Sequence, residues 1–276
     1  MPAANSLSYT LGYEKNYEKI VVFDLDETLG YFTEFGIFCD CLDRYFKKQT
    51  YSSINFNKLL DLYPEFLRPK ILNILNYLKE KKKEKKCYKV MIYTNNQGPK
   101  SWAKSISEYF DYKTEYKIFD QIIAAFKIRG EKVELGRTSY DKTVDDLFRC
   151  TKLPEEVEIC FIDDLYHNGM NDEHVYYINV KPYHHKLTIH NLMLRFLNSS
   201  LAKNIKNKTE FITIIENEFK KYHYKVNEKT KEEQDIDSIV GKKMFQHLKR
   251  FFYENNNKTL SRKKKNNKKT LKKKRS

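Results

Sequence analysis

The chain has 276 residues, 40% of them hydrophobic, and a formal net charge of +15. This composition excludes wholesale disorder, and no apolar run approaches the roughly 18–20 residues that a membrane span requires. The first residues lack the basic-then-apolar pattern of a secretory signal, so we expect no membrane contact and an intracellular protein, cytoplasmic or nuclear.

The excess of positive charge is confined to the end of the chain. Residues 258–276 hold 11 Lys and Arg residues and no acidic ones, which leaves 41 basic and 37 acidic residues elsewhere. Such a segment cannot bury apolar surface, so we predict a disordered tail. It could solubilise the chain, direct it to the nucleus, or make weak contacts with nucleic acid or an acidic partner. The low glycine content suggests an AT-rich genome, as in protists or large DNA viruses.

The cysteines indicate reduced thiols. Their number is odd and no CxxC pair occurs, which argues against a disulfide framework or a zinc ribbon. The five residues are Cys39, Cys41, Cys87, Cys150 and Cys160.

Four short apolar runs predict strands. They contain many β-branched and aromatic residues, as is typical of strands that are buried on both faces of a parallel sheet. The runs are residues 19–23, 89–93, 157–162 and 175–180.

Helical periodicity lies between these runs. Pro69 can occupy the first turn of a helix whose apolar side includes Leu75, and the lysine run 79–86 would be its solvated end or a surface loop. Ser101 is a candidate N-cap for the next helix, and residues 143–148 suggest another. Alternating strands and helices predict right-handed crossovers and an α/β fold.

The character of the chain changes after about residue 185. Residues 187–201, 205–222 and 236–252 have helical patterns, and we expect these helices to pack on the core or on each other.

Polar clusters follow three of the predicted strands. Asp24 and Asp26 follow the first, Thr94 the second, and Asp163 and Asp164 the third. Ligands bind beyond the carboxyl ends of the strands in such sheets, so we expect these side chains to converge on one crevice. Carboxylates suit Mg²⁺, and a pair of them allows one to act as nucleophile while the other is a general acid.

These segments resemble the motifs of haloacid dehalogenase (HAD) superfamily phosphatases. Residues 24–29 read DLDETL, a form similar to that of the RNA polymerase II C-terminal-domain phosphatases and their NLI-interacting-factor-like relatives. Residues 67–69 resemble their Arg-Pro signature, Thr94 their second motif, residues 140–142 the third, and Asp163-Asp164 the fourth.

The resemblance implies a HAD-like Rossmannoid sheet over residues 17–185, with a small insertion at 31–63 near the active site. A helical extension, 186–257, and the tail, 258–276, would follow. The resembled phosphatases have no large cap here, and an open site would admit a phosphorylated peptide or protein.

The resemblance also implies a mechanism in two steps. Asp24 would attack phosphorus and form an aspartyl-phosphate, while Asp26 would protonate the leaving oxygen and later activate water. The Thr94 hydroxyl and the Asn95 amide would bind phosphoryl oxygen, and Lys142 would neutralise charge. Lys127 is the competing lysine.

Mg²⁺ would be held by Asp24, by the main-chain carbonyl of Asp26, and by Asp163 or Asp164. Thr28 would buttress the turn and contribute to substrate binding.

Some residues depart from the family pattern. Asn95-Asn96 stands where a small residue usually follows the threonine, the fourth motif is Asp-Asp in place of Asp-Asn, and Gly30 replaces an apolar residue. His167, His174, His184 and His185 show no metal-ligand pattern, so we interpret them as surface or core residues.

The main prediction is a Mg²⁺-dependent phosphatase for phosphoserine or phosphothreonine. Two alternatives remain open: a phosphatase for nucleic-acid end phosphates or small phosphometabolites, and a non-catalytic interaction module on the same fold.

Overall fold

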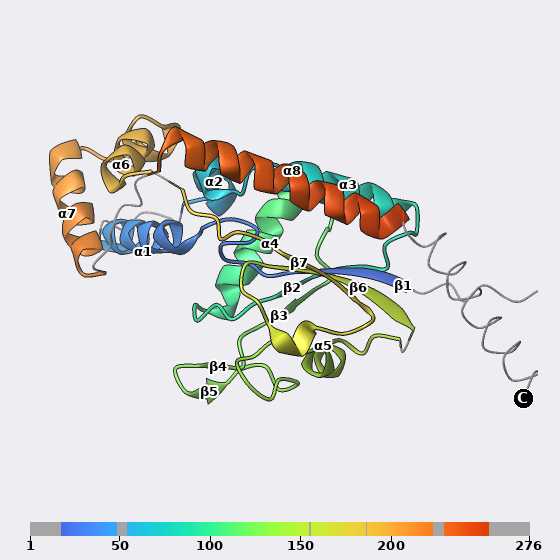
Figure 1. Ribbon diagram of the computed structural model, residues 1–276. Coiled ribbons are helices and arrows are strands. Elements are labelled where there is room, and N and C mark those ends of the chain that lie inside the picture. The colour runs from blue at the N-terminus through green and yellow to red at the C-terminus, as the bar shows by residue number, and fades with distance from the viewer. Residues whose placement is uncertain (1–17, 49–53, 155, 186, 223–228, 254–276) are drawn as a thin grey trace, which may run out of the picture.

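The computed structural model describes residues 18–48, 54–154, 156–185, 187–222 and 229–253 (Figure 1). The predicted basic tail, 258–276, lies outside the described residues.

A parallel sheet of five strands forms the centre of the molecule, in the order β3-β2-β1-β6-β7. The predicted α/β fold and its four predicted strands are confirmed as β1 (Glu18–Phe23), β2 (Lys89–Tyr93), β6 (Val157–Asp163) and β7 (Val175–Asn179). The edge strand β3 (Gln121–Ile123) was not predicted, because three residues are too few to show a pattern. Residues 20–23 of the central strand are 0% exposed, as expected for a strand covered on both faces.

Helices cover the two faces of the sheet. On one face, α3 (Ile71–Lys83), α4 (Lys100–Thr114) and α8 (Lys231–Tyr253) bury Val21, Phe23 and their neighbours. On the other, α5 (Val144–Thr151) and the 3₁₀ turn Asn168–Met170 cover Ile20 and Val22.

Three predicted helices match α3, α4 and α5, with two corrections. Helix α3 begins at Ile71 after the N-cap Lys70, so Pro69 precedes the helix and does not occupy its first turn. Helix α4 begins at Lys100 and its N-cap is Pro99, so Ser101 lies inside the first turn and is not the cap. The lysine run is mostly helical, since α3 continues to Lys83, and Lys82 pairs with Asp120 at 2.8 Å, just before β3.

A second group of helices, which we call the helical lobe, stands at the carboxyl end of the sheet (Figure 1). It consists of α1 (Thr33–Lys48), α2 (Phe56–Asp61), α6 (Ile189–Leu197) and α7 (Lys208–Lys220). Phe38 of α1 packs on Phe196 and Phe219, with ring centroids 5.7 and 6.4 Å apart, and the Tyr63 hydroxyl donates to Leu192 O at 2.8 Å. The predicted insertion (31–63) and the predicted extension therefore share one hydrophobic core with the sheet.

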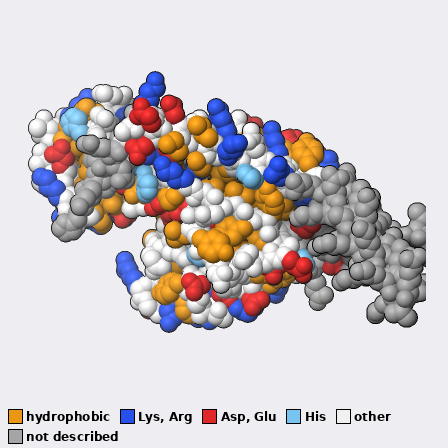
Figure 2. Space-filling model, viewed as in Figure 1, with side chains coloured by type: hydrophobic (Ala, Val, Ile, Leu, Met, Phe, Trp, Pro, Cys, Tyr) orange, Lys and Arg blue, Asp and Glu red, His pale blue; other side chains and the backbone are white. Residues whose placement is uncertain are grey.

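A small hairpin lies on the other side of the carboxyl ends, formed by β4 (Lys127–Ile128) and β5 (Glu131–Lys132). Gly130 allows its tight turn, because its φ of +87° is a conformation that side chains disfavour. The lobe and the hairpin flank a recess in the surface (Figures 1 and 2).

The long helix α8 makes two close contacts with the rest of the fold. A Cβ on Gly241 would lie 2.2 Å from the carbonyl oxygen of Pro69, so only glycine fits at this crossing. Near the end of the helix, the Lys19 ammonium donates to Phe251 O and lies 4.8 Å from that residue's ring centroid. The start of β1 and the end of α8 are thus joined.

None of the helices in the described ranges combines the length and the apolar composition needed to cross a membrane. The five cysteines are free thiols, as predicted.

Candidate active site

The loop after β1 is held in place by the buried side chain of Arg68. Its guanidinium donates to Thr28 O at 2.6 Å, to Lys181 O at 2.9 Å, and to Glu27 O. Glu27 has a φ of 60°, and Gly30 approaches so closely that a Cβ would lie 2.3 Å from Phe66 O. Gly30, which replaces the family's apolar residue, and Arg68 of the Arg-Pro segment therefore have the same role. Both shape the loop that carries Asp24 and Asp26.

Three carboxylates converge at the ends of β1 and β6. Asp24, Asp163 and Asp164 each offer an oxygen within 4.8 Å of the others, the one such cluster among the described residues. The set is hard, oxygen-only and largely buried, and therefore fits Mg²⁺. The side chain of Asp26 does not belong to it, and the predicted metal ligand of Asp26 is its main-chain carbonyl.

Thr28 serves the cluster and does not face open space. The residue is fully buried, its hydroxyl donates to Asp164 Oδ1 at 2.9 Å, and the Asp164 N–H donates to the same hydroxyl at 3.1 Å. This position fits the predicted role of Thr28 as a support for the turn. The hydroxyl already bonds to Asp164, so it is not free for the predicted contact with substrate.

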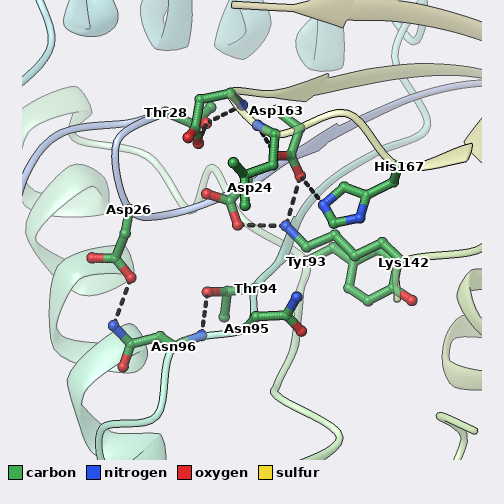
Figure 3. A network of polar contacts seen from close by, with 12 residues as sticks. Asp24, Asp26, Thr28, Tyr93, Thr94, Asn95, Asn96, Lys142, Asp163 and His167 are labelled. Carbon is green, nitrogen blue, oxygen red and sulfur yellow. Dashed lines mark hydrogen bonds and ion pairs between the residues drawn. The ribbon is translucent and has the colours of Figure 1, made fainter. Parts of the chain in front are cut away.

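Lys142 is the lysine that reaches the carboxylates. Its Nζ lies 2.5 Å from Asp24 Oδ1 and 2.7 Å from Asp163 Oδ2, and its side chain is 2% exposed (Figure 3). Lys127 lies instead on β4, with its ammonium 5.1 Å from the Phe126 ring centroid.

The buried charges shift one another's pKa. Burial alone lowers the pKa of Lys142, but Asp24 and Asp163 outweigh it and the net shift is upward. Burial raises the pKa of Asp24 even though Lys142 opposes it. Burial also opposes ionisation of Asp163, yet His167 and Lys142 hold its pKa below the usual range.

The interpretation of the histidines as surface or core residues omits that His167, which is partly buried, lies beside the site. Its Nε2 lies 3.4 Å from Asp163 Oδ2, four residues earlier in the chain. The others fit that interpretation: His185 pairs with buried Glu34 at 3.2 Å, and His174 lies exposed on Asp172 at 3.0 Å. His184 lies 3.3 Å from the partly exposed Glu27.

The loop after β2 brings Thr94 beside the carboxylates, and a second buried arginine anchors this loop. Arg137 is 0% exposed and donates to Thr94 O at 3.2 Å and to Asn95 Oδ1 at 2.7 Å. Asn95 Nδ2 donates to Tyr140 O at 2.9 Å, so this side chain holds the loop and leaves the main-chain amide for the predicted phosphoryl contact. Nothing local in the sequence marks Arg137 as an anchor of this loop, because Thr94 and Asn95 are about 40 residues away. Its contacts nearer in sequence, with Tyr140 O and Asp141 O, are to main-chain carbonyls that any residue provides.

Asp26 is turned toward the same loop. Asn96 Nδ2 donates to Asp26 Oδ2 at 2.6 Å, while Asp26 Oδ1 is buried and has no partner among the described residues. Burial raises the pKa of Asp26.

A groove of about 420 Å³ extends from Asn96 between α1 and α4. Its walls include the apolar side chains of Ile37, Phe56 and Trp102, and exposed Asp40 and Asp43 line it on α1. The groove therefore begins beside the residue that contacts Asp26.

Together, the fold and the site define a class: an α/β phosphatase of the HAD superfamily, with an aspartate pair, a threonine, a lysine and a carboxylate cluster at the carboxyl edge of a parallel sheet. The family model of the NLI interacting factor-like phosphatases matches residues 19–211, so the chain belongs to this family. The match passes residue 185, the predicted domain end, and includes α6. Comparisons with curated proteins and with solved structures found no match.

Proposed function

We propose that this protein is a Mg²⁺-dependent phosphatase that hydrolyses phosphoserine or phosphothreonine monoesters through an aspartyl-phosphate. The observation that carries the proposal is the position of Asp24, a buried carboxylate next to Lys142, Asp163 and Asp164, with Asp26 two residues further on.

Each side chain has a distinct part in the proposed reaction. An Asp24 oxygen attacks phosphorus, and the bond to the ester oxygen breaks as that oxygen takes a proton from Asp26. Asp26, now ionised, removes a proton from water, which attacks phosphorus and releases phosphate from Asp24. Thr94 and the Asn95 amide bind phosphoryl oxygen, and Lys142 balances the negative charge. Mg²⁺, held by Asp24, Asp163 and Asp164, would supply further charge neutralisation.

The groove supports a peptide or protein substrate over a small metabolite. A small phosphate ester would leave most of the 420 Å³ empty, whereas an extended peptide can place neighbouring side chains against Phe56 and Trp102. Asp40 and Asp43 favour a peptide with basic residues near the phosphorylated position. The alternative of a nucleic-acid substrate depends on the basic residues 258–276 and thus on composition alone.

A phosphopeptide panel with an Asp24→Asn variant tests the function. With Mg²⁺, we expect the wild-type protein to release phosphate from phosphoserine or phosphothreonine peptides faster than from sugar phosphates or a phosphorylated oligonucleotide end. Asp24→Asn should reduce turnover by at least about 10³-fold, since a carboxamide is a poor nucleophile. Excess EDTA should silence the wild type, and added Mg²⁺ should restore it.

An exposed carboxylate serves as the matched control. Asp172→Asn removes a negative charge away from the cluster and should leave turnover unchanged. Equal turnover by wild type and Asp24→Asn would refute the assignment of Asp24 as the nucleophile. A preference for the oligonucleotide would favour nucleic-acid end phosphates as the substrate.

A further inference from the structure

Asn96 is fixed by three hydrogen bonds, of which Figure 3 shows those with Thr94 and Asp26. Its N–H donates to Thr94 Oγ1 at 3.0 Å, its Oδ1 accepts from Gly98 N at 2.8 Å, and its Nδ2 donates to Asp26 Oδ2 at 2.6 Å. The bond from Gly98 settles the orientation of the amide, because a main-chain N–H requires an acceptor and only the carbonyl end of Asn96 provides one.

This orientation makes the two oxygens of Asp26 chemically different. The Asn96 amide nitrogen can only donate, so Asp26 Oδ2 must accept and cannot carry a proton directed at the amide. Asp26 Oδ1 is buried without a partner among the described residues. When the carboxyl is protonated, the proton therefore belongs on Oδ1.

We propose that Asn96 is a positioning residue, which pins Oδ2 of Asp26 so that Oδ1 is the oxygen that exchanges protons with the leaving group and then with water. Asn96 has this role only if the phosphatase function proposed above holds. In the first step, Oδ1–H gives its proton to the ester oxygen as that oxygen leaves phosphorus and Asp24 gains the phosphoryl group. In the second step, Oδ1 takes a proton from water as the hydroxyl oxygen bonds to phosphorus and Asp24 is freed.

A substitution at Gly98 is a second way to disturb the hydrogen bond between Asn96 and Asp26. A Cβ at this position would lie 2.8 Å from Asn96 Oδ1, the far end of a flexible side chain, and the Gly98 backbone needs no left-handed φ. Gly98→Ala should therefore be tolerated by the fold and should displace the Asn96 amide from Asp26.

The test compares two substrates that differ in their need for an acid. A serine alkoxide needs a proton in order to leave, whereas p-nitrophenolate leaves without one. The quantity to measure is kcat/KM, because it includes only the steps up to formation of the aspartyl-phosphate. Asn96→Ala should lower kcat/KM about 10- to 100-fold for a phosphoserine peptide but less than about threefold for p-nitrophenyl phosphate. Gly98→Ala should show a smaller loss with the same selectivity.

A double variant and a control substitution at the neighbouring Gln97 complete the experiment. Because both changes act through one contact, Asn96→Ala/Gly98→Ala should be no worse than Asn96→Ala alone. Gln97 is exposed in the same loop and, among the residues that the structure describes, its side chain donates to Asn95 O alone, so Gln97→Ala should leave turnover of both substrates unchanged.

Equal losses on both substrates, no loss, or additive losses in the double variant would overturn the role of Asn96. Thermal unfolding of each variant shows whether it is folded; if Asn96→Ala is not, Gly98→Ala alone decides, by its selectivity. A wild-type protein that hydrolyses neither substrate would instead refute the phosphatase function itself, and with it the role of Asn96.

Discussion

Lys142 lies between two carboxylates that water hardly reaches. Asp24 and Asp163 are 7% and 1% exposed, so each would repel the other strongly without a cation between them. The ammonium at 2.5 and 2.7 Å from their oxygens therefore serves stability as well as charge balance during the reaction.

Replacement of this lysine should affect both properties. Lys142→Met leaves Asp24 without a cation and Asp163 with His167 alone, and we expect the free energy of unfolding at neutral pH to fall by about 3 kcal/mol and turnover to fall about 10²-fold or more. Urea unfolding without Mg²⁺ measures the first quantity. Lys127→Met, on the hairpin, should change stability by less than about 0.5 kcal/mol.

The sign of the pH dependence follows from the lost cation. Without Lys142 the pKa values of both aspartates are higher than in the wild type, so the variant gains stability as pH falls and its carboxyls become neutral. The wild type loses the contribution of Asp163, whose pKa is depressed, over the same range. The stability difference should thus narrow toward pH ~4; a constant difference would mean that packing, and not charge, explains the loss.

The sequence marks only some residues of the site. Asp24, Thr94 and Asp163 stand where buried strands end, a place that topology brings together whatever the intervening chain contains. Asn96 and His167 carry no such mark, because each acts on one oxygen of an aspartate, and the geometry of that oxygen depends on the folded loops.

At the scale of elements, α8 crosses the segment just before α3 so closely that a Cβ on Gly241 would lie 2.2 Å from Pro69 O. In an exposed helix interior, Gly→Ala would stabilise by about 1 kcal/mol, but at Gly241 the new methyl group meets the Pro69 carbonyl, which cannot move aside. We expect Gly241→Ala to lower the free energy of unfolding by about 1–3 kcal/mol, as overpacking typically does.

Thermal and urea unfolding can measure this effect. Gln246→Ala, exposed on the same helix, serves as the control and should be neutral. Stabilisation by Gly241→Ala would show that α8 can shift along the sheet at little cost.

Helices and strands could be predicted from the sequence where a segment carries a clear local pattern, such as an apolar run or a capping residue. The four longer strands are continuous apolar runs, and α5 has a local cap, because Thr143 Oγ1 accepts from Asp146 N. Helix α1 was not predicted as a helix, and Phe38 on this helix packs on partners in α6 and α7 that are more than 150 residues away.

At the scale of the molecule, we expect that the chain cannot be divided at residue 185, because the helical lobe joins segments from both sides of that position. Phe38 and Tyr63 come from the first third of the chain, yet Leu192, Phe196 and Phe219 cover them. A protein that ends at residue 185 would expose this apolar surface.

Two truncations test this unity. Residues 1–185 should be aggregated or lack a cooperative unfolding transition, because part of the common core is missing. Residues 1–253 keep every described element and should retain phosphopeptide turnover within about twofold. A folded and active 1–185 fragment would show that the lobe is an accessory.

The contact between Lys19 and Phe251 has a practical consequence. It joins the beginning of β1 to the end of α8 at the opposite pole of the sheet from the three carboxylates (Figure 1). A fluorophore at either place would remain far from the chemistry, and immobilisation through this pole would leave the crevice facing the solution. A donor and an acceptor dye at the two places would report unfolding, since separation of this contact would reduce energy transfer.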